Sequence, residues 1–163
     1  MTKPDNYLYF DDFREGQVFP LPEYKVSKEE IIAYASEFDP QPHHLTEEGG
    51  RNSLLGKMSA SGWHVSAIGM RMLDEGLYNH SSSAAGISVD EVRWLKPVSP
   101  GDVLVGRVEV LEARTSARHD DRGYLKLKME IFDGNICVMK LVTVGMFMRR
   151  PKTETLPANS ETR

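Results

Sequence analysis

Cysteine is nearly absent from this sequence, in which Cys137 is the only one among 163 residues. A single thiol excludes an intrachain disulfide and a cysteine metal cluster. Because its neighbours are apolar, we expect Cys137 to be buried and inert, and we expect a cytoplasmic protein by default. The five histidines do not form a His-x-x-x-His pair with a third ligand nearby, so we expect no metal site.

Long apolar runs are also missing, and Lys140 interrupts the longest one. Neither a membrane span nor a secretory signal is therefore expected. Positive charge is not in excess either, because the net charge is −4 and the basic residues are scattered. This balance argues against a nucleic-acid partner or an anionic membrane surface. No glycine-rich phosphate loop or dinucleotide fingerprint follows a strand, so nothing points to a bound cofactor.

The first strong structural signal is a helix over residues 27–38. Ser27 and Glu30 form a capping box at its start, and the residue before Pro40 is driven out of helical geometry at its end. Its apolar residues recur at helical spacing and predict one buried stripe: Ile31, Tyr34, Ala35 and Phe38. The segment that follows reads as a glycine-containing loop.

A second helix is predicted from residue 62 to about residue 78. It is apolar over most of its circumference, which is typical of a helix buried on several sides. From residue 84 onward the apolar residues instead alternate, which predicts strands separated by turn-forming residues. The expected strands cover residues 87–95, 102–113, 123–132 and 136–148. The sequence thus predicts one α+β domain over residues 1–150, an antiparallel sheet around one helix, with a polar tail at 151–163.

Asp39 and His44 flank two prolines in "FDPQPHHL", residues 38–45. They could be a helix end followed by a solvated histidine, which is a common arrangement. Alternatively, they could hold one water about 2.6–3.2 Å from each group, ready to transfer a proton. Pro40 and Pro42 would then fix the pair before substrate arrives.

The same segment resembles the Asp-x-Asn-Pro-x-His signature of the MaoC-like dehydratases, the hot-dog-fold family that includes (R)-specific enoyl-CoA hydratases. Asp39, Pro42 and His44 match the signature, whereas Gln41 replaces Asn and His43 replaces an aliphatic residue. The stretches "ASGWHVSAIGMRML" and "EVRWLKPVSPGDVL" resemble the central helix and the following strand and turn of the family. The likeness covers most of residues 10–150, in the expected order.

The resemblance implies a hot-dog fold and an acyl thioester of coenzyme A or of a carrier protein as substrate. Asp39 and His44 would activate a water that adds to, or leaves from, the acyl chain. Gly62 would offer its backbone N–H to the thioester carbonyl, where a helix N-terminus favours negative charge. No cofactor is implied, because coenzyme A enters as part of the substrate. The family also pairs subunits across open sheet edges, so we expect a homodimer or higher homo-oligomer.

Other residues of these segments have plainer interpretations. We expect His43 to point outward or line a rim, and His64 to make packing or polar contacts. Trp63, Met70 and Met72 are expected in the core or in the wall of an acyl pocket.

Two other functions remain open at this stage, because one fold can host several chemistries. Hot-dog thioesterases commonly place a carboxylate near the start of the central helix, whereas here the first acids are Asp74 and Glu75, about three turns in. The chain could also bind acyl thioesters without catalysis, with Asp39 and His44 solvated.

Overall fold

A computed structural model describes residues 7–152 of the chain. The polar tail expected at residues 151–163 therefore lies outside the described residues, apart from Pro151 and Lys152. No helix within the described range is both long and apolar enough to cross a lipid bilayer.

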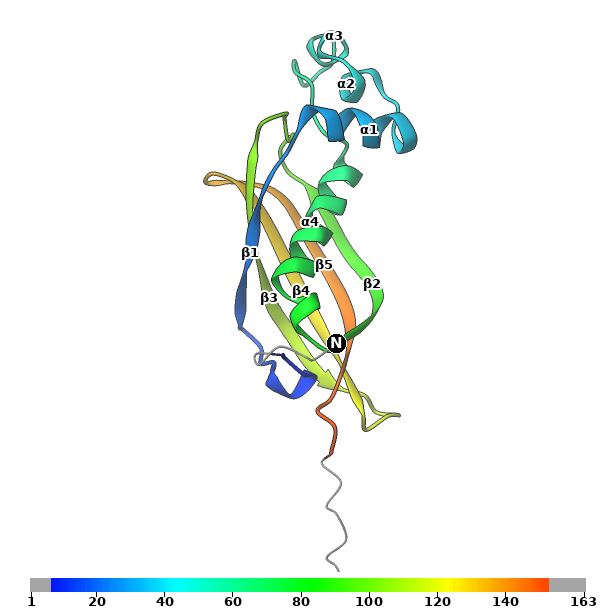
Figure 1. The fold of residues 1–163 in the computed structure, drawn as a ribbon, viewed down its shortest axis with the longest axis vertical. Helices are drawn as coiled ribbons and strands as arrows, with labels where there is room; N and C mark the ends of the chain where they lie inside the picture. The colour runs from blue at the N-terminus through cyan, green and yellow to red at the C-terminus, as the bar shows by residue number, and fades with distance from the viewer. Residues whose placement is uncertain (1–6, 153–163) are drawn as a thin grey trace, which may run out of the picture.

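One five-stranded antiparallel sheet curves around a central helix, as the sequence predicted (Figure 1). The strand order is β1-β3-β4-β5-β2, so β1 and β2 form the two edges. The central helix, α4 (Gly62–Gly76), lies in the concave face of the sheet. The strands are β1 (Val18–Lys25), β2 (Ser83–Trp94), β3 (Val103–Thr115), β4 (Arg122–Asp133) and β5 (Ile136–Met148). This arrangement is the hot-dog fold.

Glycine-containing turns connect the strands at the positions that the sequence indicated. Gly134 has φ 53° in the tight turn between β4 and β5, and Gly101 has φ 91° just before β3. Both values lie in the left-handed region, which glycine enters without steric cost. The switch from helical to alternating apolar spacing near residue 84 thus marks the start of β2, and the prediction of strands from there is confirmed.

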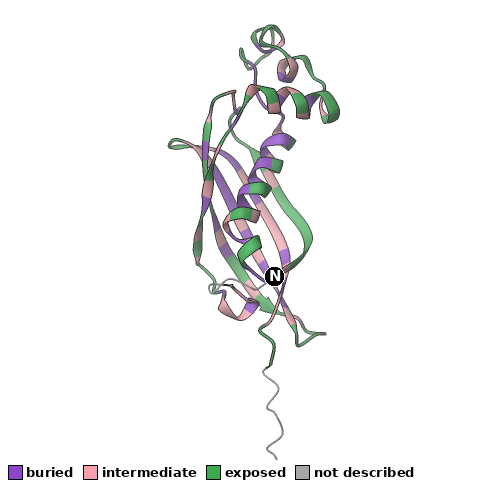
Figure 2. Ribbon diagram, viewed as in Figure 1, coloured by how far each residue is buried: buried purple, intermediate pink, exposed green. Residues whose placement is uncertain are grey.

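The core lies between α4 and the inner face of the sheet (Figure 2). Along β4 buried and partly buried residues alternate, so one side of the strand faces the helix. Gly69 permits close packing there, because a Cβ at this position would lie 2.8 Å from the terminal methyl groups of Met129 and Met139. The buried residues that α4 contributes are His64, Val65, Ile68, Gly69, Met72 and Leu73.

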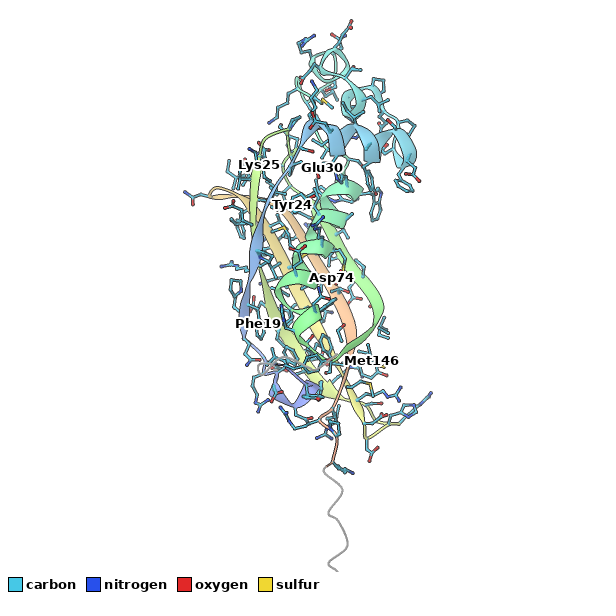
Figure 3. All side chains as sticks on the ribbon, viewed as in Figure 1. Phe19, Tyr24, Lys25, Glu30, Asp74 and Met146 are labelled. Atoms are coloured by element: carbon cyan, nitrogen blue, oxygen red, sulfur yellow. The ribbon has the colours of Figure 1, made fainter. Side chains whose placement is uncertain are left out.

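Helix α1 (Lys28–Phe38) begins with the predicted capping box. Ser27 Oγ accepts from the Glu30 N–H, and the Glu30 carboxylate accepts from the Ser27 N–H. Glu30 also accepts a 2.8 Å hydrogen bond from the Tyr24 hydroxyl, which links α1 to β1 (Figure 3). The helix ends at Phe38 because Asp39, which precedes Pro40, takes an extended φ of −153°.

Two short helices occupy the segment that the sequence suggested was a loop. Helix α2 (Pro42–Leu45) begins with proline at its first position, and α3 (Glu47–Arg51) is capped by the Thr46 hydroxyl. Together with α1 they form a cap beyond the N-terminal end of α4 (Figure 1). Two 3-10 turns complete the fold, η1 (Phe10–Asp12) and η2 (Tyr78–His80).

Phe38 was expected in the buried stripe of its helix but is 65% exposed, so that expectation is wrong. Met72 is buried in the core as expected, whereas Trp63 is 60% exposed and Met70 is exposed, so these two are not core residues. Met70 lines a cavity beside β2, and the Trp63 ring packs edge-on against Trp94. Apolar character alone therefore did not predict full burial. Cys137 is only half-buried, although partial desolvation still raises the pKa of its thiol and keeps it in the less reactive form.

Candidate active site

Asp39 lies at the C-terminal cap of α1 with both carboxylate oxygens occupied. The Gln41 side-chain amide donates to Oδ1 at 2.8 Å, and the Ser61 hydroxyl donates to Oδ2 at 2.7 Å. These donors, Ser61 first, hold the pKa of Asp39 below its usual range, and the opposing effect of burial is smaller. Asp39 is therefore ionised at neutral pH.

His44 is a buried residue of α2 whose tautomer is determined by its partner. Its Nδ1 lies 2.7 Å from the Ser59 carbonyl oxygen. Because a carbonyl oxygen only accepts, Nδ1 must carry the proton. The neutral ring consequently has its lone pair on Nε2, the nitrogen that lies 3.5 Å from Asp39 Oδ2.

The gap between Nε2 and Oδ2 is longer than a direct N–H···O hydrogen bond of about 2.7–3.2 Å. With the ring neutral, both atoms are acceptors, so neither can donate to the other. A molecule with two O–H donors can satisfy both at once, and water is the smallest such molecule. The predicted acid–imidazole pair is thus brought together in a geometry that suits a shared water.

Gly62 is the first residue of α4, and its lack of a side chain has a clear structural reason. A Cβ built on Gly62 would lie 2.6 Å from the indole ring of Trp94, so any larger residue would displace that ring. The Trp94 indole N–H donates to Ser66 Oγ at 3.1 Å, which holds the ring over the start of the helix. Trp94 therefore packs directly against the end of α4 that carries free backbone N–H groups.

His44 and Gly62 line the same cavity, which has a volume of about 330 Å³. Its wall is mostly apolar, and Lys96 is the only Asp, Glu, Lys or Arg residue that lines it. Asp39 does not line this cavity, but it approaches it through His44 and Ser61. The lining residues are His44, Leu55, Ser59, Ala60, Gly62, Val65, Trp94, Leu95, Lys96, Pro97, Val98 and Val138.

Two further histidines lie on the neighbouring helices α2 and α4. His43 is half-buried, with its ring centroid 4.0 Å from that of His44, and burial followed by the nearby His44 lowers its pKa. His64 makes the packing contact that the sequence predicted, because its ring stacks on Tyr34 at 4.7 Å and 9°. Within residues 7–152 its Nδ1 has no hydrogen-bond partner, and burial lowers its pKa.

Sequence reasoning missed the residues that orient the pair. Ser59 acts through its backbone carbonyl, which no sequence pattern reveals. Ser61 directly precedes the second predicted helix, and no sequence pattern indicated that its hydroxyl would reach Asp39. Gln41 was noticed only as a replacement for Asn, although an amide two residues after Asp39 could have suggested a local hydrogen bond.

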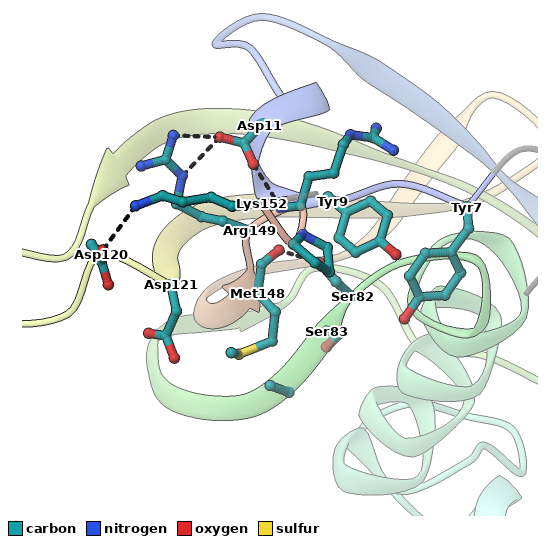
Figure 4. Close-up of a pocket in the computed structure, with 13 residues that line it drawn as sticks. Tyr7, Tyr9, Asp11, Ser82, Ser83, Asp120, Asp121, Met148, Arg149 and Lys152 are labelled. Atoms are coloured by element: carbon teal, nitrogen blue, oxygen red, sulfur yellow. Dashed lines mark hydrogen bonds and ion pairs between the residues drawn. The ribbon is translucent and has the colours of Figure 1, made fainter. Parts of the chain in front are cut away.

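Two larger cavities lie elsewhere. One, of about 870 Å³, lies at the far end of the molecule from α2, beside Tyr7 and Tyr9 (Figure 4). Its charged side chains form ion pairs, for example Arg149 with Asp11 and Lys152 with Asp120. The other, of about 620 Å³, runs between the C-terminal half of α4 and the exposed strand β2. Among the described residues no cluster of three or more His, Cys, Asp or Glu side chains could hold a metal ion.

The chain thus combines a hot-dog domain with an Asp–His pair beside the N-terminal end of its central helix. A family model described as "MaoC like domain" matches residues 13–128. The chain therefore belongs to the MaoC-like family of hydratases and dehydratases.

The chain is also similar to individual known proteins. The chain is 33% identical over 141 residues to the uncharacterized protein YdeM of Bacillus subtilis, covering 81% of this chain and 98% of that protein. The crystal structure of the MaoC-like dehydratase from Rhodospirillum rubrum is 34% identical, with a TM-score of 0.84 over 89% of this chain and 99% of that one. The R-hydratase PhaJ1 of Pseudomonas aeruginosa shares the fold, with a TM-score of 0.69 at 17% identity over 96% and 97% of the two chains.

We predict that His64 makes folding stability depend on pH. Its pKa in the folded protein is lowered, so the unfolded chain binds a proton more readily, from about pH 6.5 downward. Stability should therefore fall as pH decreases through this value, and His64→Leu should remove part of that loss. Urea unfolding at pH 7.5 and at pH 5.5 measures this loss of stability. Between the two pH values, the free energy of unfolding should drop less in His64→Leu than in the wild-type protein. Equal drops in both proteins would contradict the prediction.

Proposed function

We propose that this protein adds water across the 2,3 double bond of an enoyl thioester, or removes it from the 3-hydroxyacyl thioester. The observation that carries the proposal is the position of His44 Nε2, 3.5 Å from Asp39 Oδ2, with its tautomer fixed by the Ser59 carbonyl. Coenzyme A is the carrier that we propose, as part of the substrate, and the reaction needs no separate cofactor.

The first step is the activation of one water by two acceptors. The water donates one O–H to His44 Nε2 and the other to Asp39 Oδ2, which leaves its oxygen lone pairs free to attack carbon 3. An imidazole is ordinarily a stronger base than a carboxylate, and the lowered pKa of Asp39 widens that difference. We therefore assign the proton transfer to His44 and the orientation of the water to Asp39.

Attack on carbon 3 pushes the electron pair of the double bond towards the thioester carbonyl, where an enolate forms. The cavity places Gly62, at the N-terminus of a 15-residue helix, in the same space as His44. Backbone N–H groups there stabilise the developing oxyanion, and one such donor is worth about 10²–10³ in rate.

The reaction closes when the His44 imidazolium returns its proton to carbon 2. One water has then been added, and His44 is neutral again, ready for the next cycle. The ionised Asp39 stabilises the imidazolium during this interval, since opposite charges 3.5 Å apart attract strongly away from bulk water. The reverse sequence of steps gives dehydration through the same groups.

The proposal predicts that the protein consumes trans-2-enoyl-CoA esters and that His44 is essential. In an assay that follows the loss of enoyl absorbance over a panel of chain lengths, His44→Asn should lower kcat by about 10²–10⁴-fold. His43→Asn is the matched control, and it should lower kcat less than about tenfold, because among the described residues His43 contacts the His44 ring but forms no hydrogen bond or ion pair with Asp39.

Two results would contradict this function. Release of free thiol from saturated acyl-CoA esters without hydration would favour a thioesterase. A thioesterase has little structural support, because Asp74 lies about 18 Å along α4 from Gly62, at about 1.5 Å per residue. Tight binding of enoyl-CoA with no turnover would favour a binding module. If His43→Asn lowers kcat more than His44→Asn does, then His43, and not His44, is the histidine of the site.

We also propose that the protein works as a homodimer, paired through β2. The opposite edge strand, β1, carries Pro20 and Pro22, which cannot donate to a neighbouring strand. In contrast, β2 has no proline, its residues 83–89 carry no charge, and ten of its twelve residues are exposed. The exposed side chains of Trp63 and Met70 on α4 add an apolar surface that a second copy would cover.

We predict that light scattering gives at least twice the chain mass of 18.4 kDa at micromolar concentration. Val89→Lys should weaken this association, because Val89 is an exposed residue of β2. Val18→Lys is the matched control, since Val18 is 54% exposed and Val89 59%, but Val18 lies on the other edge. A monomeric wild-type protein, or equal effects of the two changes, would contradict pairing through β2.

A further inference from the structure

Ser61 occupies a helix-capping position but does not cap the helix. It directly precedes α4, where a serine side chain usually accepts a hydrogen bond from the second or third backbone N–H of the helix. Ser61 makes no such bond, and its hydroxyl instead donates to Asp39 Oδ2 at 2.7 Å. The side chain is buried, with 1% of the residue exposed, so solvent does not compete for this contact.

The bond acts on the carboxylate oxygen that faces His44. Asp39 Oδ2 is the atom 3.5 Å from His44 Nε2, and Ser61 is its donor within the protein. Gln41 holds the other oxygen, Oδ1, from an exposed position two residues away. Ser61 therefore determines where Oδ2 lies, whereas Gln41 restrains the opposite side of the same group.

The same bond has a second effect on α4. Because the Ser61 hydroxyl is directed towards Asp39, it leaves the first N–H groups of the helix without a side-chain cap. These are the donors that face the thioester carbonyl in the proposed reaction. One hydroxyl thus ties the end of α1 to the start of α4, 22 residues apart, and keeps the helix N-terminus open.

We propose that Ser61 is a positioning residue, whose hydroxyl fixes the Asp39 carboxylate beside His44 and, by not capping α4, leaves the helix N-terminus available to the substrate. This inference rests on the proposed hydration of enoyl thioesters. In this role the hydroxyl acts through Asp39, to which it donates its hydrogen bond. The depressed pKa of Asp39, for which Ser61 is the first cause, agrees with this role.

The test compares Ser61→Ala with Gln41→Ala in the full chain. Ser61→Ala removes one hydroxyl and no helix cap, so the fold should persist. A hydrogen bond to a charged group is worth a factor of about 10–100, and we expect kcat with an enoyl-CoA ester to fall by that factor while KM changes little. Gln41→Ala should lower kcat by a smaller factor, because Gln41 binds Asp39 Oδ1, whereas Oδ2 is the oxygen that faces His44.

A carboxyl ¹³C titration of Asp39 by NMR supplies a readout that does not need turnover. Loss of the Ser61 donor should move the Asp39 titration to higher pH, and Ser61→Thr, which keeps a hydroxyl, should restore it. Ser99→Ala is the control: within the described residues the Ser99 hydroxyl is buried without a partner, and Ser99 does not line the cavity. It should leave both the titration and kcat unchanged.

Each outcome decides one question. If Ser61→Ala leaves both kcat and the Asp39 titration unchanged, or if Gln41→Ala is the more damaging, the positioning role is overturned. If kcat and KM change together with a loss of stability and no change in titration, Ser61 is only a packing residue and the inference also fails. If the wild-type protein hydrates no thioester, the proposed function fails, whereas the titration still decides whether Ser61 controls Asp39.

Discussion

The hydrogen bond from His44 Nδ1 to the Ser59 carbonyl is the interaction on which the rest of the site depends. A carbonyl oxygen cannot donate, so this contact leaves only one neutral tautomer and directs the Nε2 lone pair at Asp39. With the opposite tautomer, Nε2 would donate to the carboxylate and the two groups would satisfy each other. The fixed tautomer instead leaves two acceptors facing each other, a geometry that a water completes.

The fold brings this arrangement about with short connections. Helix α1 ends at Phe38, just before Asp39, and α2 places His44 shortly after it. Ser61 directly precedes the central helix. The sheet that wraps α4 buries one face of that helix and so fixes where its N-terminus lies. His44 from the cap and the N-terminal end of the central helix meet at one cavity. The site that we propose therefore lies at the junction of two elements that are held by different contacts.

Much of the fold could be predicted from local sequence. The Ser27–Glu30 capping box, the alternating strands and the glycine turns are decided by residues within a few positions of each other. The short helices α2 and α3 could not be predicted in this way, because four- and five-residue helices depend on their surroundings more than on propensity. Exposure of Phe38 and Trp63 was also missed, because burial of an apolar face requires a neighbour that the sequence does not name.

The site was predictable only in part for a related reason. Asp39, His44 and Gly62 were identified by a motif and by the position of a glycine before a helix. Their orientation depends on partners such as Ser59 and Ser61, which reach them over 15 and 22 residues through a backbone carbonyl and a redirected hydroxyl. The pKa of Asp39 likewise depends on these partners, because the hydrogen bonds from Ser61 and Gln41 lower it.

The most direct test of the central claim is a double-mutant cycle on kcat with an enoyl-CoA substrate, using Asp39→Ala, His44→Asn and both together. If the two groups act as one unit on one water, each single change should remove most of the rate, and the double variant should be little slower than the slower single variant. Losses that multiply in the double variant would show that Asp39 and His44 contribute independently, and would contradict the shared water.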